Sequence, residues 1–141
     1  MKNRDGGEVN DHWQTPMWLY NQLNDEFNFD FDPCPIRATF NGLSPSTVWG
    51  KSNFVNPPYN RKDKPLFIKR AFEEWQKGAT CVLLIPVATS TKQFHEIIKP
   101  YAEIRFLKGR VAFVGVNSKG ERTTTQKGKH DSMVVIFKGK L

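Results

Sequence analysis

Residues 80–86, Thr-Cys-Val-Leu-Leu-Ile-Pro, contain the longest uninterrupted apolar run of the chain. Apolar and polar side chains do not alternate in this run, so a strand at this position must be covered on both faces. Such a strand is typical of the sheet of an α/β protein, which carries helices on each side. The run is also far shorter than the ~18 apolar residues that span a bilayer. We therefore expect an α/β fold and no membrane partner.

Three other segments repeat apolar residues at the spacing of a helix. The first follows Thr15-Pro16, a pair suited to the N-cap and the first position of a helix. The second lies at residues 65–77 and the third at residues 94–101. By contrast, residues 36–51 are rich in Asn, Ser, Gly and Pro, and this composition predicts a loop.

Short segments with the composition of strands surround these helices. Strands are expected at residues 27–32, 52–56, 102–107, 111–114 and 133–137, in addition to 80–86. The segments 102–107 and 111–114 flank a Lys-Gly-Arg turn and are compatible with a hairpin. The order of the elements predicts an α/β fold with a mostly parallel sheet and an antiparallel C-terminal strand. A chain of 141 residues is expected to form a single domain, here with a flexible polar arm at residues 1–10.

Cysteine and histidine are sparse. The cysteines, Cys34 and Cys81, lie far apart in the sequence, and the three histidines share no metal-ligand spacing. Neither a disulfide framework nor a metal site is indicated. The first ten residues lack the apolar segment of a signal peptide. These features predict a reduced protein of the cytoplasm that needs no metal.

Positive charge is concentrated towards the end of the sequence. The chain has 21 Lys and Arg against 14 Asp and Glu, a net charge of +7, and nine of the basic residues but three of the acidic ones fall in residues 101–141. Such a surface attracts polyanions. Residues 116–130 are predicted to be a basic loop that contacts DNA, although an ordinary surface loop has the same composition. The basic residues of this loop are Lys119, Arg122, Lys127 and Lys129.

The tetrapeptide Asn56-Pro57-Pro58-Tyr59 follows the strand expected at residues 52–56 and suits one kind of chemistry. An exocyclic amine on a heteroaromatic ring is a poor nucleophile because its lone pair is delocalised into the ring. The Asn56 side-chain oxygen and the Pro57 carbonyl together can accept both amino hydrogens and localise that lone pair. Tyr59 offers a flat face on which a base can stack. The alternative is a Pro-Pro turn with an Asn cap and a buried Tyr.

The tetrapeptide matches the catalytic motif of S-adenosylmethionine-dependent amino-methyltransferases. More of the chain resembles the small phage-type DNA adenine-N6 methyltransferases, over roughly residues 11–137. The other segments that carry this resemblance are Trp13-Gln14-Thr15-Pro16, Phe31-Asp32-Pro33-Cys34, Asn41-Gly42-Leu43, Gly78-Ala79-Thr80, residues 82–86, residues 105–110 and residues 132–135.

The resemblance implies a compact Rossmann-like methyltransferase fold, S-adenosylmethionine as methyl donor and a flipped adenine in DNA as acceptor. It implies that Asn56, Pro57, Pro58 and Tyr59 form the catalytic turn. Six residues are implied to contact the donor: Thr15 and Pro16 near its carboxylate, Asp32, Pro33 and Cys34 near its methionine part, and Asn41 near its adenosine.

The sequence departs from the family pattern in one respect. Residues 32–40 contain no Gly, whereas many methyltransferases have a Gly-rich turn after the first strand. The backbone must therefore approach the donor in another way. An inactive basic nucleic-acid-binding domain remains an alternative, as does an enzyme that methylates RNA or a protein glutamine amide. If the chain is encoded by a phage, the cytoplasm of the bacterial host is the expected location.

Overall fold

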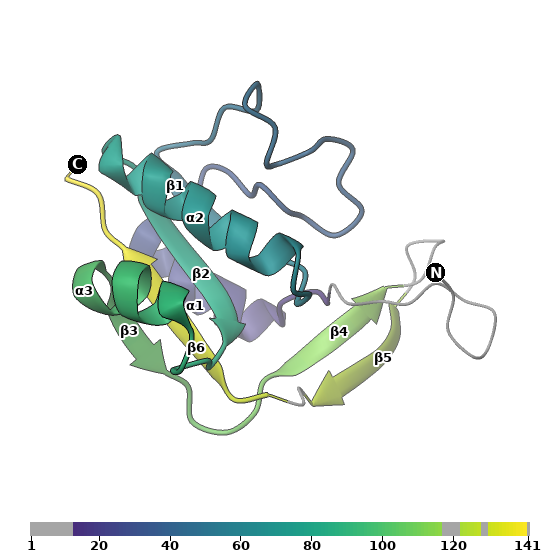
Figure 1. Ribbon diagram of the computed structural model, residues 1–141. Coiled ribbons are helices and arrows are strands. Elements are labelled where there is room, and N and C mark those ends of the chain that lie inside the picture. Colours follow the sequence, from purple (N-terminus) through teal and green to yellow (C-terminus); the bar gives the residue numbers. More distant parts are fainter. Residues whose placement is uncertain (1–12, 117–121, 128–129, 141) are drawn as a thin grey trace.

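The computed structural model describes residues 13–116, 122–127 and 130–140 (Figure 1). Its main element is a four-stranded sheet with the strand order β1-β2-β6-β3. These strands are β1 Ser52–Val55, β2 Thr80–Pro86, β6 Ser132–Phe137 and β3 Glu103–Phe106. β1 and β2 are parallel, whereas β6 is antiparallel to both β2 and β3.

The prediction of a mostly parallel sheet is therefore wrong, although the antiparallel C-terminal strand is confirmed. β1, β2 and β3 run in one direction, but β6 inserts between β2 and β3 and makes two of the three pairings antiparallel. Every residue of β6 is buried, whereas β3 is partly exposed. The apolar strand thus takes the centre of the sheet and the charged strand an edge, where unpaired backbone groups meet solvent.

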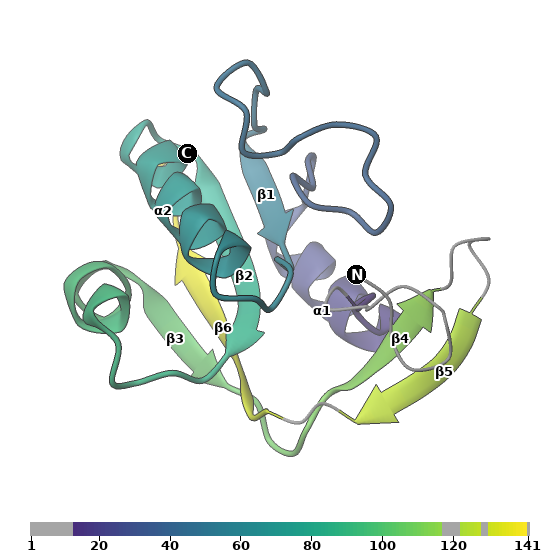
Figure 2. The same ribbon diagram turned by 45° about the vertical axis from the view of Figure 1, so that its right-hand side comes forward.

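Helices cover both faces of the sheet, as the unbroken apolar sequence of β2 predicts (Figures 1 and 2). They are α1 Met17–Phe27 on one face, and α2 Asp63–Gln76, the π-helix η1 Phe94–Ile98 and α3 Lys99–Tyr101 on the other. Along β2, Val82 and Leu84 belong to the core under α1, and Leu83 and Ile85 to the core under α2. Two apolar faces explain why the sequence of this strand does not alternate.

Two further strands form a separate antiparallel pair beside the main sheet (Figure 2). They are β4 Ala112–Val116 and β5 Arg122–Lys127. The hairpin expected between residues 102–107 and 111–114 is therefore wrong, since β3 pairs with β6 and β4 with β5. Gln14 and Val114 exchange backbone hydrogen bonds of 2.8 and 3.0 Å, which attach β4 to the segment before α1.

The strand expected at residues 27–32 is reduced to one bridge between Phe31 and Asn53 of β1. Directly after this bridge, an Asp32 side-chain oxygen accepts a hydrogen bond from the Cys34 N–H at 2.9 Å. This Asx turn, with a proline at its centre, leads the chain away from the sheet.

The helices agree more closely with the sequence patterns. α1 begins after Pro16, which is its N-cap in place of the predicted Thr15. The Thr91 hydroxyl accepts a hydrogen bond from the Phe94 N–H at 3.1 Å at the start of η1. None of the described helices is long and apolar enough to cross a membrane.

Candidate functional site

Asn56 begins the turn that follows β1, and it is only 6% exposed. Its Nδ2 donates hydrogen bonds to the Trp13 carbonyl at 2.8 Å and to the Thr15 hydroxyl at 3.0 Å. Thr15 is itself buried. Because both contacts engage the nitrogen, they fix the orientation of the amide and turn Oδ1, an acceptor, to the other side of the group.

Tyr59 ends the same turn and is fixed at both ends of its side chain. Its hydroxyl donates a hydrogen bond of 3.1 Å to the Leu84 carbonyl of β2. Its ring meets the Phe113 ring of β4 edge to face, with centroids 6.0 Å apart. Burial raises the pKa of Tyr59, so the hydroxyl stays protonated at neutral pH and can keep donating. The ring is thus held between the two sheets.

A cavity of about 370 Å³ lies beside Asn56 on the α1 side of the sheet. Thr15, Asp32, Cys34 and Asn56 all line it, so the structure brings together one predicted catalytic residue and three of the predicted donor-binding residues. Tyr20 of α1 also lines the cavity. The sequence did not predict this role, because the helical spacing of Tyr20 and its neighbours indicates a core position.

A second hollow, of about 250 Å³, adjoins the first, since Cys34 and Pro35 line both. Two other predicted donor-binding residues, Pro33 and Asn41, line this second hollow. The Asn41 side-chain oxygen accepts a hydrogen bond from the Leu43 N–H at 3.0 Å, which stabilises the local turn. Pro16 lines neither space and serves as the N-cap of α1.

Asp32 places a carboxyl group in the first cavity. Burial raises its pKa to about 6, and the hydrogen bond from the Cys34 backbone opposes this effect. In the described part of the chain no ion pair includes Asp32. A buried carboxylate that no cation of the described residues compensates favours a positively charged ligand.

The pKa values of two neighbouring groups, Tyr20 and Cys34, are also raised. The pKa of Tyr20 is raised, first by burial and then by the charge of Asp32. Burial also raises the pKa of the Cys34 thiol well above its ordinary value. Cys34 therefore stays protonated at neutral pH, and a thiolate nucleophile is not available there.

The turn at Asp32 contains no glycine, but a glycine on the opposite loop packs directly against it. A Cβ added at Gly42 would collide with the Pro33 carbonyl oxygen, so only glycine allows the two segments to approach this closely. The Asn41-Gly42 pair in an expected loop is the sequence signal for this contact.

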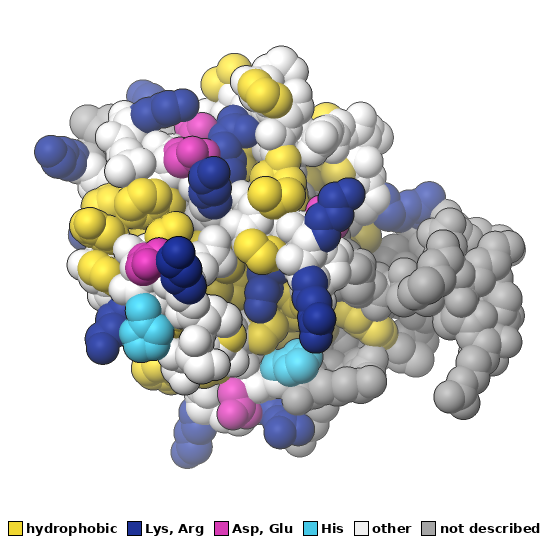
Figure 3. All heavy atoms as spheres, viewed as in Figure 1, with side chains coloured by type: hydrophobic (Ala, Val, Ile, Leu, Met, Phe, Trp, Pro, Cys, Tyr) yellow, Lys and Arg dark blue, Asp and Glu magenta, His cyan; other side chains and the backbone are white. Residues whose placement is uncertain are grey.

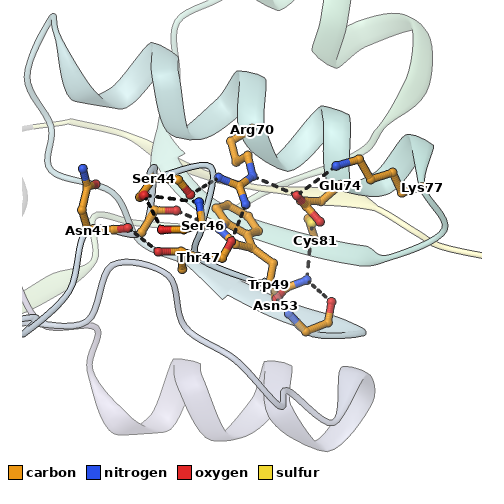
Figure 4. Close-up of polar contacts among 12 residues, drawn as sticks. Asn41, Ser44, Ser46, Thr47, Trp49, Asn53, Arg70, Glu74, Lys77 and Cys81 are labelled. Carbon is orange, nitrogen blue, oxygen red and sulfur yellow. Dashed lines mark hydrogen bonds and ion pairs between the residues drawn. The ribbon is translucent and has the colours of Figure 1, made fainter.

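Arg70 of α2 holds that loop in place (Figure 4). Its guanidinium donates hydrogen bonds to the Ser44 and Thr47 carbonyls at 3.1 and 2.7 Å and lies over the Trp49 ring. The Trp49 indole N–H donates in turn to the Gly42 carbonyl at 2.8 Å. The 36–51 loop is thus ordered by side chains, and Gly42 is held against the Asp32 turn.

The predicted basic DNA contacts are only partly within the described residues. Lys119 and Lys129 lie outside them. Arg122 and Lys127 are the first and last residues of β5, so this part of the predicted loop at residues 116–130 is a strand. Among the residues that the structure describes, no group of three or more His, Cys, Asp or Glu could hold a metal ion.

Comparison with known proteins gives two matches. A family model described as DNA N-6-adenine-methyltransferase (Dam) matches residues 3–140. A protein of Escherichia phage T1, named DNA N-6-adenine-methyltransferase, is 29% identical over 155 residues, an alignment that covers 92% of this chain and 63% of the phage protein. The chain therefore spans less than two thirds of the length of this relative. No solved structure matches the chain.

Proposed function

Because the chain belongs to the DNA N-6-adenine-methyltransferase (Dam) family, we propose that it transfers a methyl group from S-adenosylmethionine to the N6 amine of adenine in DNA. Family membership confirms the resemblance read from the sequence motifs. The observation that carries the proposal is the fixed amide of Asn56, which borders a cavity that also contains the carboxyl group of Asp32.

The residues around the cavity fit the methyl donor. Asp32 offers a carboxylate to the ammonium group of the donor, and the Thr15 hydroxyl lies within the same cavity as a partner for the donor carboxylate. Pro33 and Asn41 border the adjoining hollow, where the apolar Phe67 and Leu43 suit the adenosine part. When bound, this donor supplies an electrophilic methyl group on its sulfonium.

Asn56 and the turn that follows it act on the acceptor. The Asn56 Oδ1 and the Pro57 carbonyl accept the two hydrogens of the adenine amine, which localises the nitrogen lone pair for in-line attack on the methyl carbon. Pro57 and Pro58 stiffen the turn. The methylated amine is acidic and loses a proton to solvent, so the residues of the turn need not act as a general base.

Tyr59 supplies the surface on which the flipped adenine stacks. Two contacts support this role: the hydrogen bond of its hydroxyl to Leu84 and the edge-to-face contact of its ring with Phe113. Both hold the ring in one orientation before the base arrives, so less conformational freedom is lost when the base binds.

Two coarser features support the finer assignments. β1, β2 and β3 share one direction and helices cover both faces of the sheet, which supports a Rossmann-like methyltransferase arrangement. The phage origin of the relative supports action in the cytoplasm of a bacterial host. Arg122 and Lys127, with Lys119 and Lys129, remain proposed contacts to DNA phosphates.

In the test, the protein is incubated with methyl-labelled donor and one acceptor at a time, which is duplex DNA, RNA or protein. We expect label in DNA, recovered as N6-methyladenine by mass spectrometry. Label found only in RNA, or only on glutamine side chains, would show that DNA is not the acceptor. If calorimetry detects no binding of the donor, the protein is an inactive relative.

A further inference from the structure

A hollow of about 580 Å³ lies on the α2 side of the sheet, between α2, the end of β2 and η1. Ile68, Ile85 and Met133 line it, and each is at most 2% exposed, so they form an apolar floor. Arg61, Lys64 and Lys92 line its border. These three cations and this floor define the basic groove, and Figure 3 shows dark blue side chains next to yellow ones on this face.

The basic groove carries an excess of positive charge. Glu96 is the one acidic residue among those that line it. Within the described ranges, none of the three groove cations forms an ion pair. Arg61 and Lys92 are exposed and Lys64 is half-buried, so all three can reach a ligand. A polyanion is the complementary partner.

Short hydrogen bonds fix the two walls of the groove. On the α2 side, the Asn60 Oδ1 accepts from the backbone N–H groups of Lys62 and Asp63 at 3.1 and 2.6 Å. Across the groove, the Gln93 side chain donates to the Pro65 carbonyl at 2.9 Å and ties the segment before η1 to the first turn of α2. The backbone segments that carry the three cations are therefore held in place before a ligand binds.

The basic groove lies close to the proposed catalytic turn, since its lining begins at Arg61, two residues after Tyr59. Val55 pairs with Leu83 in the parallel register, so the turn at residues 56–59 lies beside the end of β2. Ile85, two residues further along β2, is in the groove floor. Asn60, which caps the groove wall, is the residue directly after Tyr59. A strand that presents a base to Tyr59 would pass over this edge of the sheet.

We propose that the basic groove binds the DNA strand that carries the target adenine, with Arg61, Lys64 and Lys92 on its phosphates and the apolar floor under a neighbouring nucleotide. This inference rests on the proposed function, because it takes DNA as the polyanion. It adds a binding surface that lies on the opposite side of the catalytic turn from the donor cavity.

The test compares two variants of equal charge. The groove variant carries Arg61→Ala, Lys64→Ala and Lys92→Ala. The control carries Lys51→Ala, Lys138→Ala and Lys140→Ala. By the pairings of β1 and β6 with β2, Lys51 and Lys138 lie at the start of β2, the end opposite to the groove, and Lys140 follows two residues later. Duplex DNA affinity is measured by fluorescence anisotropy between about 50 and 200 mM salt, with S-adenosylhomocysteine present, which has no methyl group to transfer.

We expect the groove variant to bind DNA at least ~10-fold more weakly than the control at low salt. Its slope of log affinity against log salt should fall by roughly 0.9 per lost phosphate contact, so by up to ~2.7. Donor affinity by calorimetry should not change. A third variant with Arg61→Lys, Lys64→Arg and Lys92→Arg keeps the charges and should keep the slope.

Three outcomes would overturn the inference. They are an equal loss of DNA affinity in the groove and control variants, an unchanged salt slope in the groove variant, and a loss of RNA affinity without a loss of DNA affinity in the groove variant. A charge-keeping variant as weak as the Ala variant would do the same. If the parent binds DNA through the groove but forms no N6-methyladenine, the inference stands and the proposed function fails. If the parent methylates DNA and the groove variant binds normally, only the inference fails.

Discussion

The side chains of Thr15 and Asn56, 41 residues apart in sequence, are joined by a hydrogen bond of 3.0 Å from the amide nitrogen to the hydroxyl. The segment before α1 and the turn after β1 therefore form one buried unit at the edge of the proposed donor cavity. Through this contact, the position of a proposed donor-binding residue sets the orientation of the proposed catalytic amide.

Thr15→Val should lower the rate of methyl transfer. Valine keeps the shape of the side chain but removes an acceptor of the Asn56 amide, a loss of about 1 to 1.5 kcal/mol and so roughly tenfold in rate if the amide becomes misaligned. The measurement is single-turnover transfer at saturating donor. Thr15→Ser retains the hydroxyl and is expected to stay near the parent rate. A Val variant as fast as the Ser variant would show that the contact does not orient Asn56.

Tyr59→Phe should retain most of the activity, whereas Tyr59→Ala should lose at least ~10-fold. Phenylalanine keeps the ring against Phe113 and loses only the hydrogen bond to Leu84, which is worth about 1 kcal/mol of stability. Alanine removes the stacking surface. Transfer rates and thermal unfolding of both variants test this prediction. If Phe is as slow as Ala, the hydroxyl and not the ring is essential.

Donor affinity should depend on the protonation of Asp32. Burial raises the pKa of this carboxyl to about 6, so it gains a proton as the pH falls through about 6 and can no longer attract an ammonium group. Calorimetry should show weaker donor binding below this pH. Asp32→Asn keeps an oxygen for the Cys34 N–H but should bind the donor at least ~10-fold more weakly at neutral pH, without this pH dependence.

The same raised pKa has the opposite consequence for the stability of the protein without donor. Between the ordinary pKa of 3.8 and about 6, the folded state binds more protons than the unfolded state, so the contribution of Asp32 to the free energy of unfolding falls as the pH rises. Asp32→Asn should therefore be at least as stable as the parent at pH 7. Their difference should shrink as the pH falls towards 4. A less stable Asn variant at pH 7 would contradict the desolvated carboxylate.

Gly42→Ala should weaken donor binding and destabilise the fold, because its Cβ would displace the carbonyl of Pro33, a residue that borders the proposed donor site. Ser46→Ala is the control in the same loop, since it removes only the 2.8 Å hydrogen bond between the Ser44 and Ser46 hydroxyls in an exposed turn and lies outside the hollow. We expect a larger loss of donor affinity and of melting temperature for Gly42→Ala. Equal effects of the two substitutions would argue against the close approach.

Elements with a strong local pattern could be predicted from the sequence. The unbroken apolar run of β2 and the amphipathic repeat of α2 correspond to the observed elements. The position of β6 could not be predicted from local sequence. β6 inserts between β2 and β3 because it can be buried on both faces, and this depends on a comparison of segments that are distant in the sequence. Residues 27–32 alternate like a strand, but the Asx turn at Asp32 and Pro33 leaves only one bridge to β1.

The candidate site likewise has a part that could be predicted from the sequence and a part that could not. The turn from Asn56 to Tyr59 is contiguous and could be read directly. Contacts between distant segments could not be predicted. Thr15 suits an N-cap, yet its hydroxyl accepts a hydrogen bond from the Asn56 side chain, and Pro16 is the N-cap of α1. Local sequence shows which groups a residue can donate or accept, but the partner depends on packing between α1 and the sheet.

The most direct measurement compares methyl transfer to DNA adenine by the parent and by Asn56→Ala, with donor affinity measured on both. The account predicts that the parent forms N6-methyladenine and that the variant binds the donor with similar affinity but transfers at least ~100-fold more slowly, as expected for the loss of one positioned electrostatic group. A variant that binds the donor and methylates adenine at nearly the parent rate would contradict the role of Asn56 and the mechanism built on it.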